Sequence, residues 1–280
     1  MTSRRAVLAG AAGLAAFPAS APAFQSLPLS LNGAWRQGGH VLGRTAPRAQ
    51  ILVDGEALSV ASTDGVFIVG LDRDAAASVE IEARADGRSA KRTLDVAPHV
   101  FPSSRIDGLP PATVEPTDPA LLERIGREAA LKADAFASRA DADDFRDGFA
   151  RPIDPWRVTS EWGAQRILNG TPARPHYGLD LGAPAGTAIR APAPGRIVLA
   201  RSGLHFEGGL VLIDHGQGLI SAYLHQSRLR VPEGERVRRG QIVGDVGMTG
   251  RATGPHLCWR LKWRDRNLDP SLMIGARAPA

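Results

Sequence analysis

The chain has 280 residues, enough for roughly two domains, each with a hydrophobic core of its own. Apolar residues make up 43% and charged residues 22%, a balance that is typical of globular proteins and excludes a wholly disordered chain. The formal charge of +5 is too small to indicate nucleic-acid binding by itself, although it suits an anionic polymer, and the single cysteine, Cys258, excludes an internal disulfide.

The first 23 residues have the layout of an export signal. Arg4 and Arg5 precede a weakly apolar stretch over 6–17, and small residues follow as far as Ala23, where cleavage fits best. The adjacent arginines resemble those of a twin-arginine signal, which implies export after folding. A membrane anchor is the alternative, but the run falls short of the ~20 strongly apolar residues that a span needs. We therefore expect a periplasmic or cell-wall-associated protein without a membrane span.

Residues 24–100 are predicted to form a small β-sandwich as an accessory domain. Short apolar runs alternate with turns at regular spacing, and two of these turns, Asp54-Gly55 and Asp86-Gly87, carry hairpin signals. Such spacing is typical of a sandwich. His40 and His99 stand alone in this region, so we interpret both as surface or loop residues and assign the domain no catalytic role.

Residues 101–150 are predicted to be a linker that contains one helix. Pro, Ser and Gly are frequent at its start, which indicates a boundary. Asp118 is a candidate N-cap with Pro119 at the first helical position, and helical spacing of apolar residues continues to about 139. The acidic run 141–147 is expected to be solvated.

Residues 151–280 are predicted to form an all-β domain. Six or more apolar runs follow one another within about 110 residues, separated by glycine-containing turns and without a helical period. The chain as a whole is therefore expected to be mainly β, with a helical linker between two β units.

A histidine and a carboxylate stand four residues apart at the start of this last domain. His176 and Asp180 lie in an extended context, and Gly178 between them permits the chain to bend so that both side chains meet at one point. Imidazole and carboxylate form part of a normal zinc site, which needs three protein ligands and one open position to be catalytic. On its own this pair is weak evidence for a metal.

Two further elements strengthen the case. His225 ends a strand after an aromatic residue, and His256 and Cys258 alternate along another strand, so that both point into the same space. The motifs resemble those of the lysostaphin-type (LytM-like) peptidoglycan zinc endopeptidases, whose marks are His-x-x-x-Asp, a strand-end His and Gly-Pro-His-x-His. The resemblance runs from about 156 to 270 and includes the segments 175–180, 191–195, 214–216, 240–244 and 250–256.

The resemblance implies a role for each of these residues. His176 and Asp180 are expected to bind one zinc ion per chain, and His225 and His256 to serve as catalytic imidazoles. The third ligand falls on Cys258, where the family pattern has a histidine. A thiolate is a legitimate zinc ligand, but a second anionic ligand lowers the Lewis acidity of the ion. The alternative is that Cys258 is a small buried hydrophobe and the metal is absent.

Other conspicuous residues of the last domain are given structural interpretations. We interpret His215 as a turn residue and His205 as a loop residue, and we expect core packing rather than a place in the groove for Trp162, Trp259 and Trp263. Residues 221–280 hold eleven basic against five acidic side chains. This surplus is either a solvated surface or an attraction for an anionic wall polymer.

The resemblance as a whole implies an exported zinc metalloendopeptidase that hydrolyses the peptide cross-bridges of bacterial peptidoglycan. Its expected partner is peptidoglycan, with no nucleic acid involved. The alternative is a degenerate relative that binds the cell wall or activates a separate amidase. Four of the five site positions match the family and the fifth, Cys258, carries a group able to bind metal, which favours the enzyme. Either histidine of the catalytic pair can be the general base.

Overall fold

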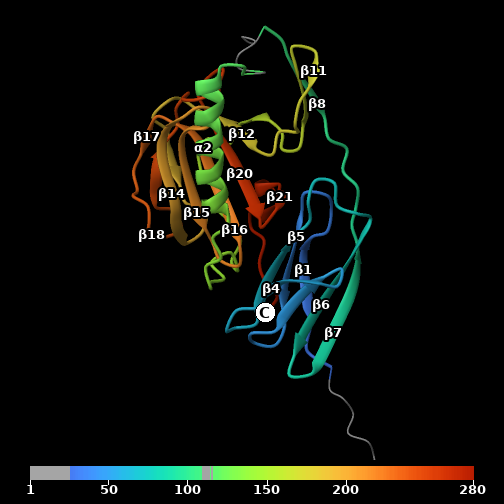
Figure 1. Ribbon diagram of the computed structural model, residues 1–280. Helices are drawn as coiled ribbons and strands as arrows, with labels where there is room; N and C mark the ends of the chain where they lie inside the picture. The colour runs from blue at the N-terminus through green and yellow to red at the C-terminus, as the bar shows by residue number, and fades with distance from the viewer. Residues whose placement is uncertain (1–25, 109–113, 115) are drawn as a thin grey trace, which may run out of the picture.

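The computed structural model describes residues 26–108, 114 and 116–280, and within them β-strands predominate (Figure 1). The prediction of a mainly β protein is confirmed. The predicted export signal over residues 1–23 lies outside the described residues. Among the described residues, no helix has both the length and the hydropathy that crossing a membrane requires.

The N-terminal half contains two sheets, with strand orders β1-β2-β5 and β4-β3-β6-β7. Buried side chains of both sheets belong to one hydrophobic cluster, so the sheets pack as the predicted sandwich. Asp54-Gly55 and Asp86-Gly87 form tight hairpin turns in which all four residues have positive φ, as expected. The strands are β1 (Ser30–Ala34), β2 (His40–Arg44), β3 (Gln50–Val53), β4 (Glu56–Val60), β5 (Val66–Gly70), β6 (Ser78–Ala85) and β7 (Arg88–Asp95).

The expectation of a surface position was wrong for His40. This side chain is 1% exposed at the start of β2, because β2 is the middle strand of its sheet and is covered on both faces. Burial lowers the pKa of His40 to about 4, so the imidazole is neutral at pH 7. His99 is partly exposed and packs edge-on against Phe101.

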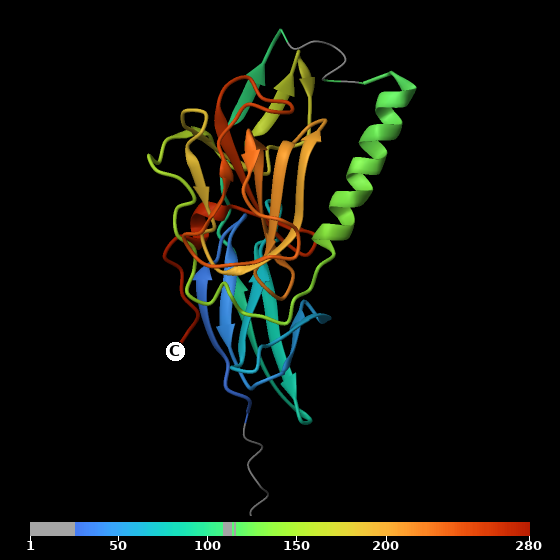
Figure 2. The same ribbon diagram turned by 90° about the vertical axis from the view of Figure 1, so that its left-hand side faces the viewer.

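One helix, α2 (Pro119–Phe136), follows the sandwich and runs along the outside of the C-terminal sheet (Figure 2). Its predicted start is confirmed, because Asp118 caps the helix and accepts a hydrogen bond from the Leu121 amide at 2.7 Å. The helix ends a little before the predicted position. Its apolar contacts with the sheet come from Leu131, Ala135 and Phe136.

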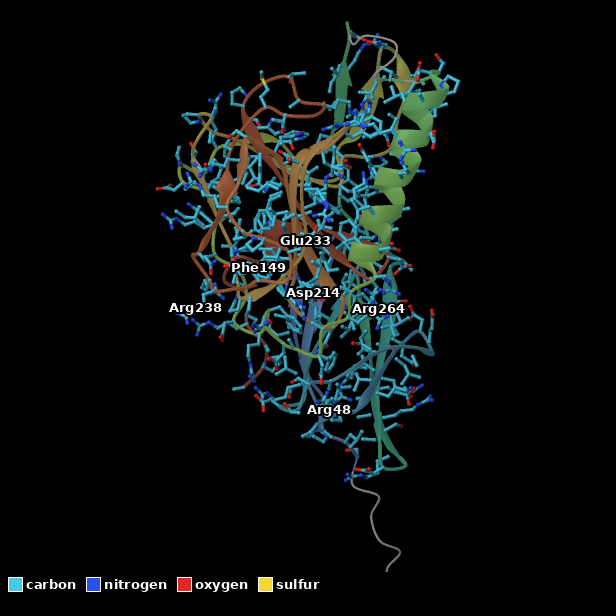
Figure 3. All side chains as sticks on the ribbon, turned by 60° about the vertical axis from the view of Figure 1, so that its left-hand side comes forward. Arg48, Phe149, Asp214, Glu233, Arg238 and Arg264 are labelled. Carbon is cyan, nitrogen blue, oxygen red and sulfur yellow. The ribbon has the colours of Figure 1, made fainter. Side chains whose placement is uncertain are left out.

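The acidic run after the helix is solvated only at its ends. Phe145 in its middle is fully buried, and this anchor draws the neighbouring carboxylates into contacts. Asp144 is paired with Arg236 of the C-terminal half at 2.6 Å. On the other side, Arg48 of the sandwich (labelled in Figure 3) donates to Asp141, also at 2.6 Å. The expectation of a solvated run was therefore wrong for its centre. Contacts of the run with both halves tie them together.

The C-terminal half is built on an eight-stranded sheet with the order β18-β14-β15-β16-β20-β12-β9, to which β21 adds by pairing with β20. The predicted all-β architecture is thus confirmed. The strands of this sheet are β9 (Val158–Ser160), β12 (Leu179–Gly182), β14 (Gly195–Leu204), β15 (Gly208–Asp214), β16 (Leu219–Gln226), β18 (Arg236–Val237), β20 (His256–Trp263) and β21 (Arg266–Leu268). A smaller sheet consists of β13 (Ala188–Arg190), β19 (Ile242–Asp245) and β17 (Arg228–Leu229), and a short 3-10 helix, η1, spans Pro270–Met273.

A third small sheet was not foreseen. It has the order β11-β10-β8, with β8 (Ser103–Ile106) parallel to β10 (Gln165–Leu168), and β10 antiparallel to β11 (Thr171–Pro172). β8 falls inside the predicted linker, where a short polar strand has no apolar pattern of its own. Its pairing with a strand more than 60 residues away creates it.

The two halves meet over a close backbone approach at the end of β5. A side chain at Gly70 would begin 2.9 Å from the Leu268 side chain and 3.0 Å from Trp263, so glycine lets the strands pack together. Arg266 donates to the Gly70 carbonyl at 3.0 Å, and Gln217 donates to the Val66 carbonyl at 2.9 Å. One hydrophobic cluster runs through both halves. The domain boundaries near 100 and 150 stay a prediction.

Candidate functional site

The candidate metal ligands are brought together by two antiparallel strands. In the pairing of β12 with β20, Asp180 lies directly opposite Cys258. Cys258 also lies opposite Leu224 of β16, so the thiol is on an inner strand and is 1% exposed. His176 precedes β12 and folds back over it through Gly178. A side chain at Gly178 would begin 2.5 Å from the Cys258 sulfur, so the bend that the sequence permits here requires glycine.

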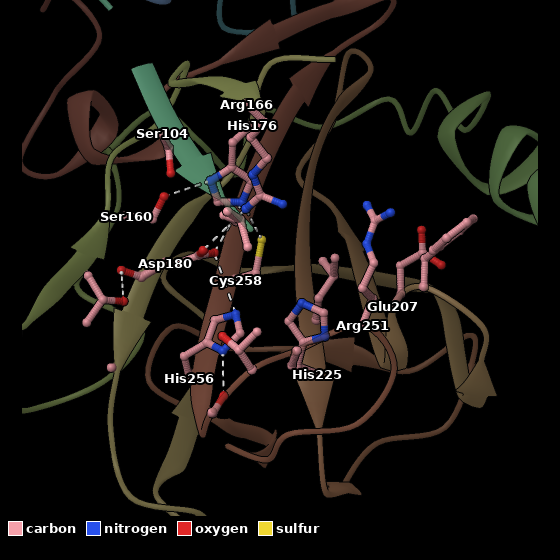
Figure 4. A pocket seen from close by; sticks show the side chains of 18 of the residues that line it. Ser104, Ser160, Arg166, His176, Asp180, Glu207, His225, Arg251, His256 and Cys258 are labelled. Carbon is pink, nitrogen blue, oxygen red and sulfur yellow. Dashed lines mark hydrogen bonds and ion pairs between the residues drawn. The ribbon is translucent and has the colours of Figure 1, made fainter. Parts of the chain in front are cut away.

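The three candidate ligands form a compact buried group. His176 Nε2 is 3.2 Å from Asp180 Oδ1 and 3.4 Å from Cys258 Sγ, and one donor atom of each residue lies within 4.8 Å of the others. Asp180 Oδ1 is buried and lacks a well-aligned hydrogen-bond donor among the described residues. Such an oxygen is costly to bury unless a cation lies beside it. A nitrogen, an oxygen and a sulfur donor at these positions fit zinc (Figure 4).

Burial sets the protonation of this group. It raises the pKa of the Cys258 thiol to about 12 and lowers the pKa of His176 below its ordinary value. It also acts to raise the pKa of Asp180, but contacts with His176 and His256 outweigh it and leave that pKa below its ordinary value. At neutral pH the group is thus a neutral imidazole, a carboxylate and a thiol. Binding of a divalent cation would displace the thiol proton.

The other nitrogen of His176 is held by a neighbour. Its Nδ1 lies 3.3 Å from the Ser160 hydroxyl of β9, which leaves Nε2 as the atom that faces Asp180 and Cys258. An oxygen partner on the distal nitrogen is a common feature of histidines that bind metals, because it fixes the ring orientation.

The two remaining histidines of the motif lie beside the metal-binding group. The ring centres of His225 and His256 are 4.7 Å apart, and His256 Nε2 is 3.7 Å from Asp180 Oδ1. His225 Nδ1 lies 2.8 Å from the Thr249 carbonyl, and His256 Nδ1 lies 2.8 Å from the Gly254 carbonyl. A carbonyl oxygen can only accept, so each Nδ1 donates, and the Nε2 of a neutral ring carries the lone pair. Both imidazoles are therefore oriented to accept a proton at Nε2.

Burial also keeps one of these rings neutral. It lowers the pKa of His225 to about 4, and the nearby His256 and Arg260 act in the same direction. His225 has a φ of 65° at the end of β16, a strained conformation for a residue with a side chain, and such conformations often mark functional positions.

All five residues line one groove of about 400 Å³, formed by the ends of β12, β16 and β20, the turn after β14 and the loop before β20. Sequence reasoning missed other residues that line it, among them Ser104 of β8 and three arginines: Arg166, Arg251 and Arg260. The alternation along β20 could have identified Arg260, which shares a face with His256 and Cys258. No local pattern points to the other two arginines, because long-range packing brings them to the groove.

The residues interpreted as structural lie away from this groove. Trp162, Trp259 and Trp263 are all buried, at 4%, 0% and 0% exposed, so the expectation of core packing is confirmed. His215 is in the turn after β15, as expected, but it is fully buried, and its Nε2 lies 2.8 Å from the Ser221 hydroxyl. His205 is a partly exposed residue of the turn between β14 and β15.

Comparison with known proteins identifies relatives of both halves. Residues 174–270 match peptidase family M23. A solved structure from Pseudomonas aeruginosa that is assigned to peptidase M23 is 30% identical with a TM-score of 0.67, and the match covers 86% of this chain and 96% of that one. This likeness extends well beyond residues 174–270 and so includes the N-terminal half.

Two curated proteins match over the C-terminal half. The peptidoglycan DD-endopeptidase ShyA of Vibrio cholerae is 38% identical over 130 residues, which are 45% of this chain and 30% of ShyA. The murein hydrolase activator NlpD of Escherichia coli is 31% identical over 119 residues, which are 42% of this chain and 31% of NlpD. The match thus spans less than a third of the length of either curated relative.

Proposed function

Since the chain belongs to peptidase family M23, we propose that its groove hydrolyses peptide cross-bridges of bacterial peptidoglycan with one zinc ion held by His176, Asp180 and Cys258. The observation that carries the proposal is the convergence of three buried donor atoms within 4.8 Å of one another, beside two imidazoles. The name of the relative ShyA supports peptidoglycan as the substrate.

The proposed mechanism assigns the proton transfers to the two histidines. A bound zinc ion supplies Lewis-acid polarisation of the scissile carbonyl and a lower pKa for the attacking water. His225 or His256 accepts the proton of that water at Nε2 and returns it to the nitrogen of the leaving amine. The second ring would stabilise the oxygen that becomes negative at the carbonyl by donating a hydrogen bond from Nε2. That role requires this ring to be protonated, because its Nδ1 already donates to a backbone carbonyl. The carbonyls of Thr249 and Gly254 keep both rings in position throughout.

The proposed location is outside the cytoplasm, in the periplasm or at the cell wall. Two observations support it: the predicted export signal over residues 1–23, with its arginine pair, and the cell-wall substrate named for the relative ShyA. The small positive charge of the chain is compatible with an anionic wall polymer.

A second candidate function has an observation of its own. Cys258 departs from the family pattern at a ligand position, and one relative is named as an activator of murein hydrolases. If the thiol is only a buried hydrophobe, the groove would bind the wall or another protein without hydrolysis.

The test uses zinc-loaded full-length protein and purified cross-linked muropeptide dimers, with monomer release followed by mass spectrometry. We expect cleavage by the wild type, no cleavage and no bound zinc for His176→Ala, and wild-type behaviour for His99→Ala, a histidine outside the groove. A wild type that binds no zinc under saturating metal and releases no monomer would instead support the activator.

A further inference from the structure

Three guanidinium groups converge on the candidate site from separate parts of the fold. Arg166 comes from β10, Arg251 from the loop between β19 and β20, and Arg260 from β20 itself. Arg260 follows His256 and Cys258 at intervals of two residues, so the strand alternation aims all three side chains toward one side of the sheet. The mechanism proposed above uses none of these arginines.

Contacts on the groove wall hold each guanidinium in place. Arg166 Nη2 is 3.6 Å from Asp180 Oδ2, and Arg260 Nε is 3.5 Å from Cys258 Sγ. The Arg251 guanidinium lies over the Phe206 ring, 4.6 Å from its centre, and its amide donates to the Phe206 carbonyl at 3.0 Å. These side chains therefore lose less conformational entropy on binding a ligand than surface arginines do.

The charges lining the groove favour an anion. Besides the three arginines, its lining contains two carboxylates, Asp180 and Glu207. Glu207 lies beside Arg251 in Figure 4 and is also 2.5 Å from the Lys132 ammonium of α2. If a divalent cation is bound, the Asp180 carboxylate and the Cys258 thiolate balance the charge of that cation. Glu207 is then the one remaining carboxylate of the lining against three guanidinium groups, and the groove is positive with or without the metal.

The arginines also affect one another. Burial lowers the pKa of Arg251 below its ordinary value, and the nearby Arg166 and Arg260 lower it further. Like charges gathered in a partly buried groove repel, and an anion between them would relieve that repulsion.

We propose that Arg166, Arg251 and Arg260 form a subsite for a free carboxylate on the peptide that enters the groove, next to the bond that is cleaved. This inference rests on the proposed function and specifies its substrate class: cross-linked peptides in which the residue adjoining the scissile bond carries a free carboxylate instead of a carboxamide. The planar guanidinium fork pairs with a carboxylate through two parallel hydrogen bonds. A carboxamide offers one neutral acceptor oxygen and lacks the charge.

The test compares two synthetic cross-linked peptide dimers that differ only at this group, one with the carboxylate and one with the carboxamide. For the zinc-loaded full-length wild type we expect kcat/KM to be about tenfold or more higher for the carboxylate form, the factor expected for one charge-assisted hydrogen bond. Arg251→Gln should lower kcat/KM for the carboxylate form by a similar factor and affect the carboxamide form much less. Arg251 is chosen because its guanidinium lies over the Phe206 ring on the groove wall, and zinc content should stay at the wild-type value.

The matched control is Arg228→Gln, which removes one positive charge from an exposed position outside the groove and should preserve the preference. Equal cleavage of both dimers by the wild type would overturn the subsite while leaving the hydrolase intact. If neither dimer is cleaved, calorimetric binding of the two dimers decides the matter. Tighter binding of the carboxylate form that Arg251→Gln abolishes supports the subsite without the hydrolase, and equal binding overturns it.

Discussion

At the scale of single residues, the histidines of the groove differ from free imidazoles because their surroundings fix both tautomer and charge. Each catalytic candidate has its Nδ1 bound to a backbone carbonyl, at Thr249 for His225 and at Gly254 for His256. A ring held in this way presents the Nε2 lone pair without a search for the right tautomer. The backbone of the loop before β20 thus prepares the pair for proton transfer.

The ring of His225 should stay neutral well below the ordinary pKa of histidine. Burial lowers its pKa to about 4, so we expect protonation near pH 4 and a neutral ring at pH 5 and above. Histidine-selective NMR of the full-length protein, with the signal assigned through His225→Gln, measures this titration. A midpoint near 6.5 would contradict the burial that the structure shows.

The same ring is expected to be needed for hydrolysis and dispensable for the metal. His225→Ala should lower kcat by about 100-fold or more, the usual contribution of a general acid–base group, while zinc content stays at the wild-type value. Metal analysis and muropeptide cleavage on the same sample measure both effects. Loss of zinc in this variant would show that His225 is a ligand and that the assignment of roles is wrong.

At the scale of elements, the helix α2 holds one wall of the groove. Lys132 Nζ is 2.5 Å from Glu207 Oε1, and Glu128 Oε2 accepts from the His205 amide at 2.8 Å. Both contacts reach the turn between β14 and β15, which contributes Phe206 and Glu207 to the groove lining. The helix therefore holds in place the turn that connects β14 and β15, which lies at the end of a long hairpin.

Removing the Lys132 ammonium, which ties α2 to Glu207, should loosen the groove wall. The side chains of Lys132 and Glu207 are 18% and 12% exposed, so removal of the ammonium leaves a mostly buried carboxylate without this partner. Such a loss costs more than the ~1 kcal/mol or less that a surface ion pair contributes. Lys132→Met should raise KM by about two- to tenfold while zinc content stays the same. Lys91→Met, which breaks a more exposed ion pair with Glu80 in the sandwich, is the matched control. An equal effect of the two substitutions on KM would show that the tether does not position the groove.

The elements that the sequence predicted share a strong local signal. The Asp-Gly turns at 54–55 and 86–87 and the Asp118 cap each act within a few residues, and the structure contains all three. β8 and the arginines of the groove lack such a signal, because pairing with β10 and packing across the groove bring them into place. Short spacings and strand alternation point to His176, Asp180, His256 and Cys258. The resemblance to the lysostaphin-type endopeptidases added the expected role of each motif residue, His225 included. The burial of His40 could not be predicted from the sequence, since it depends on the strands on both sides of β2.

At the scale of the whole molecule, the two halves share one hydrophobic core. We propose nevertheless that the chain is organised as a sandwich over 24–100, a linker over 101–150 and a peptidase core over 151–280, because the candidate ligands and both candidate catalytic imidazoles fall in the last of these. The contact of Gly70 with Leu268 and Trp263 shows how closely the sandwich is fitted to that core. The stability of the protein should therefore respond to changes in either half.

A buried histidine in each half makes this stability depend on pH. Burial lowers the pKa of His40 and of His215 to about 4, whereas the unfolded chain titrates near 6.5. Between pH 6.5 and about 4 the unfolded state binds more protons, so the free energy of unfolding should fall as the pH falls through this window. Each histidine contributes a loss of roughly 2 kcal/mol at pH 5 relative to pH 7.

Urea unfolding at pH 7 and pH 5 measures the effect. His40→Leu should reduce the difference between the two pH values, because it removes one of the buried histidines that titrate in this window. It also removes a ring nitrogen that has no hydrogen-bond partner among the described residues. His99→Leu, at a partly exposed position, should leave the difference as it is. A wild type as stable at pH 5 as at pH 7 would contradict the burial of both rings.

The central claim is that the thiol of Cys258 completes a zinc site with His176 and Asp180, and X-ray absorption at the zinc edge of the purified full-length protein tests it most directly. The account predicts one zinc per chain with a single sulfur neighbour at about 2.3 Å and the remaining neighbours, nitrogen or oxygen, at about 2.0–2.2 Å. The sulfur signal should vanish in Cys258→Ser. A zinc spectrum with nitrogen and oxygen neighbours alone in the wild type would contradict the account.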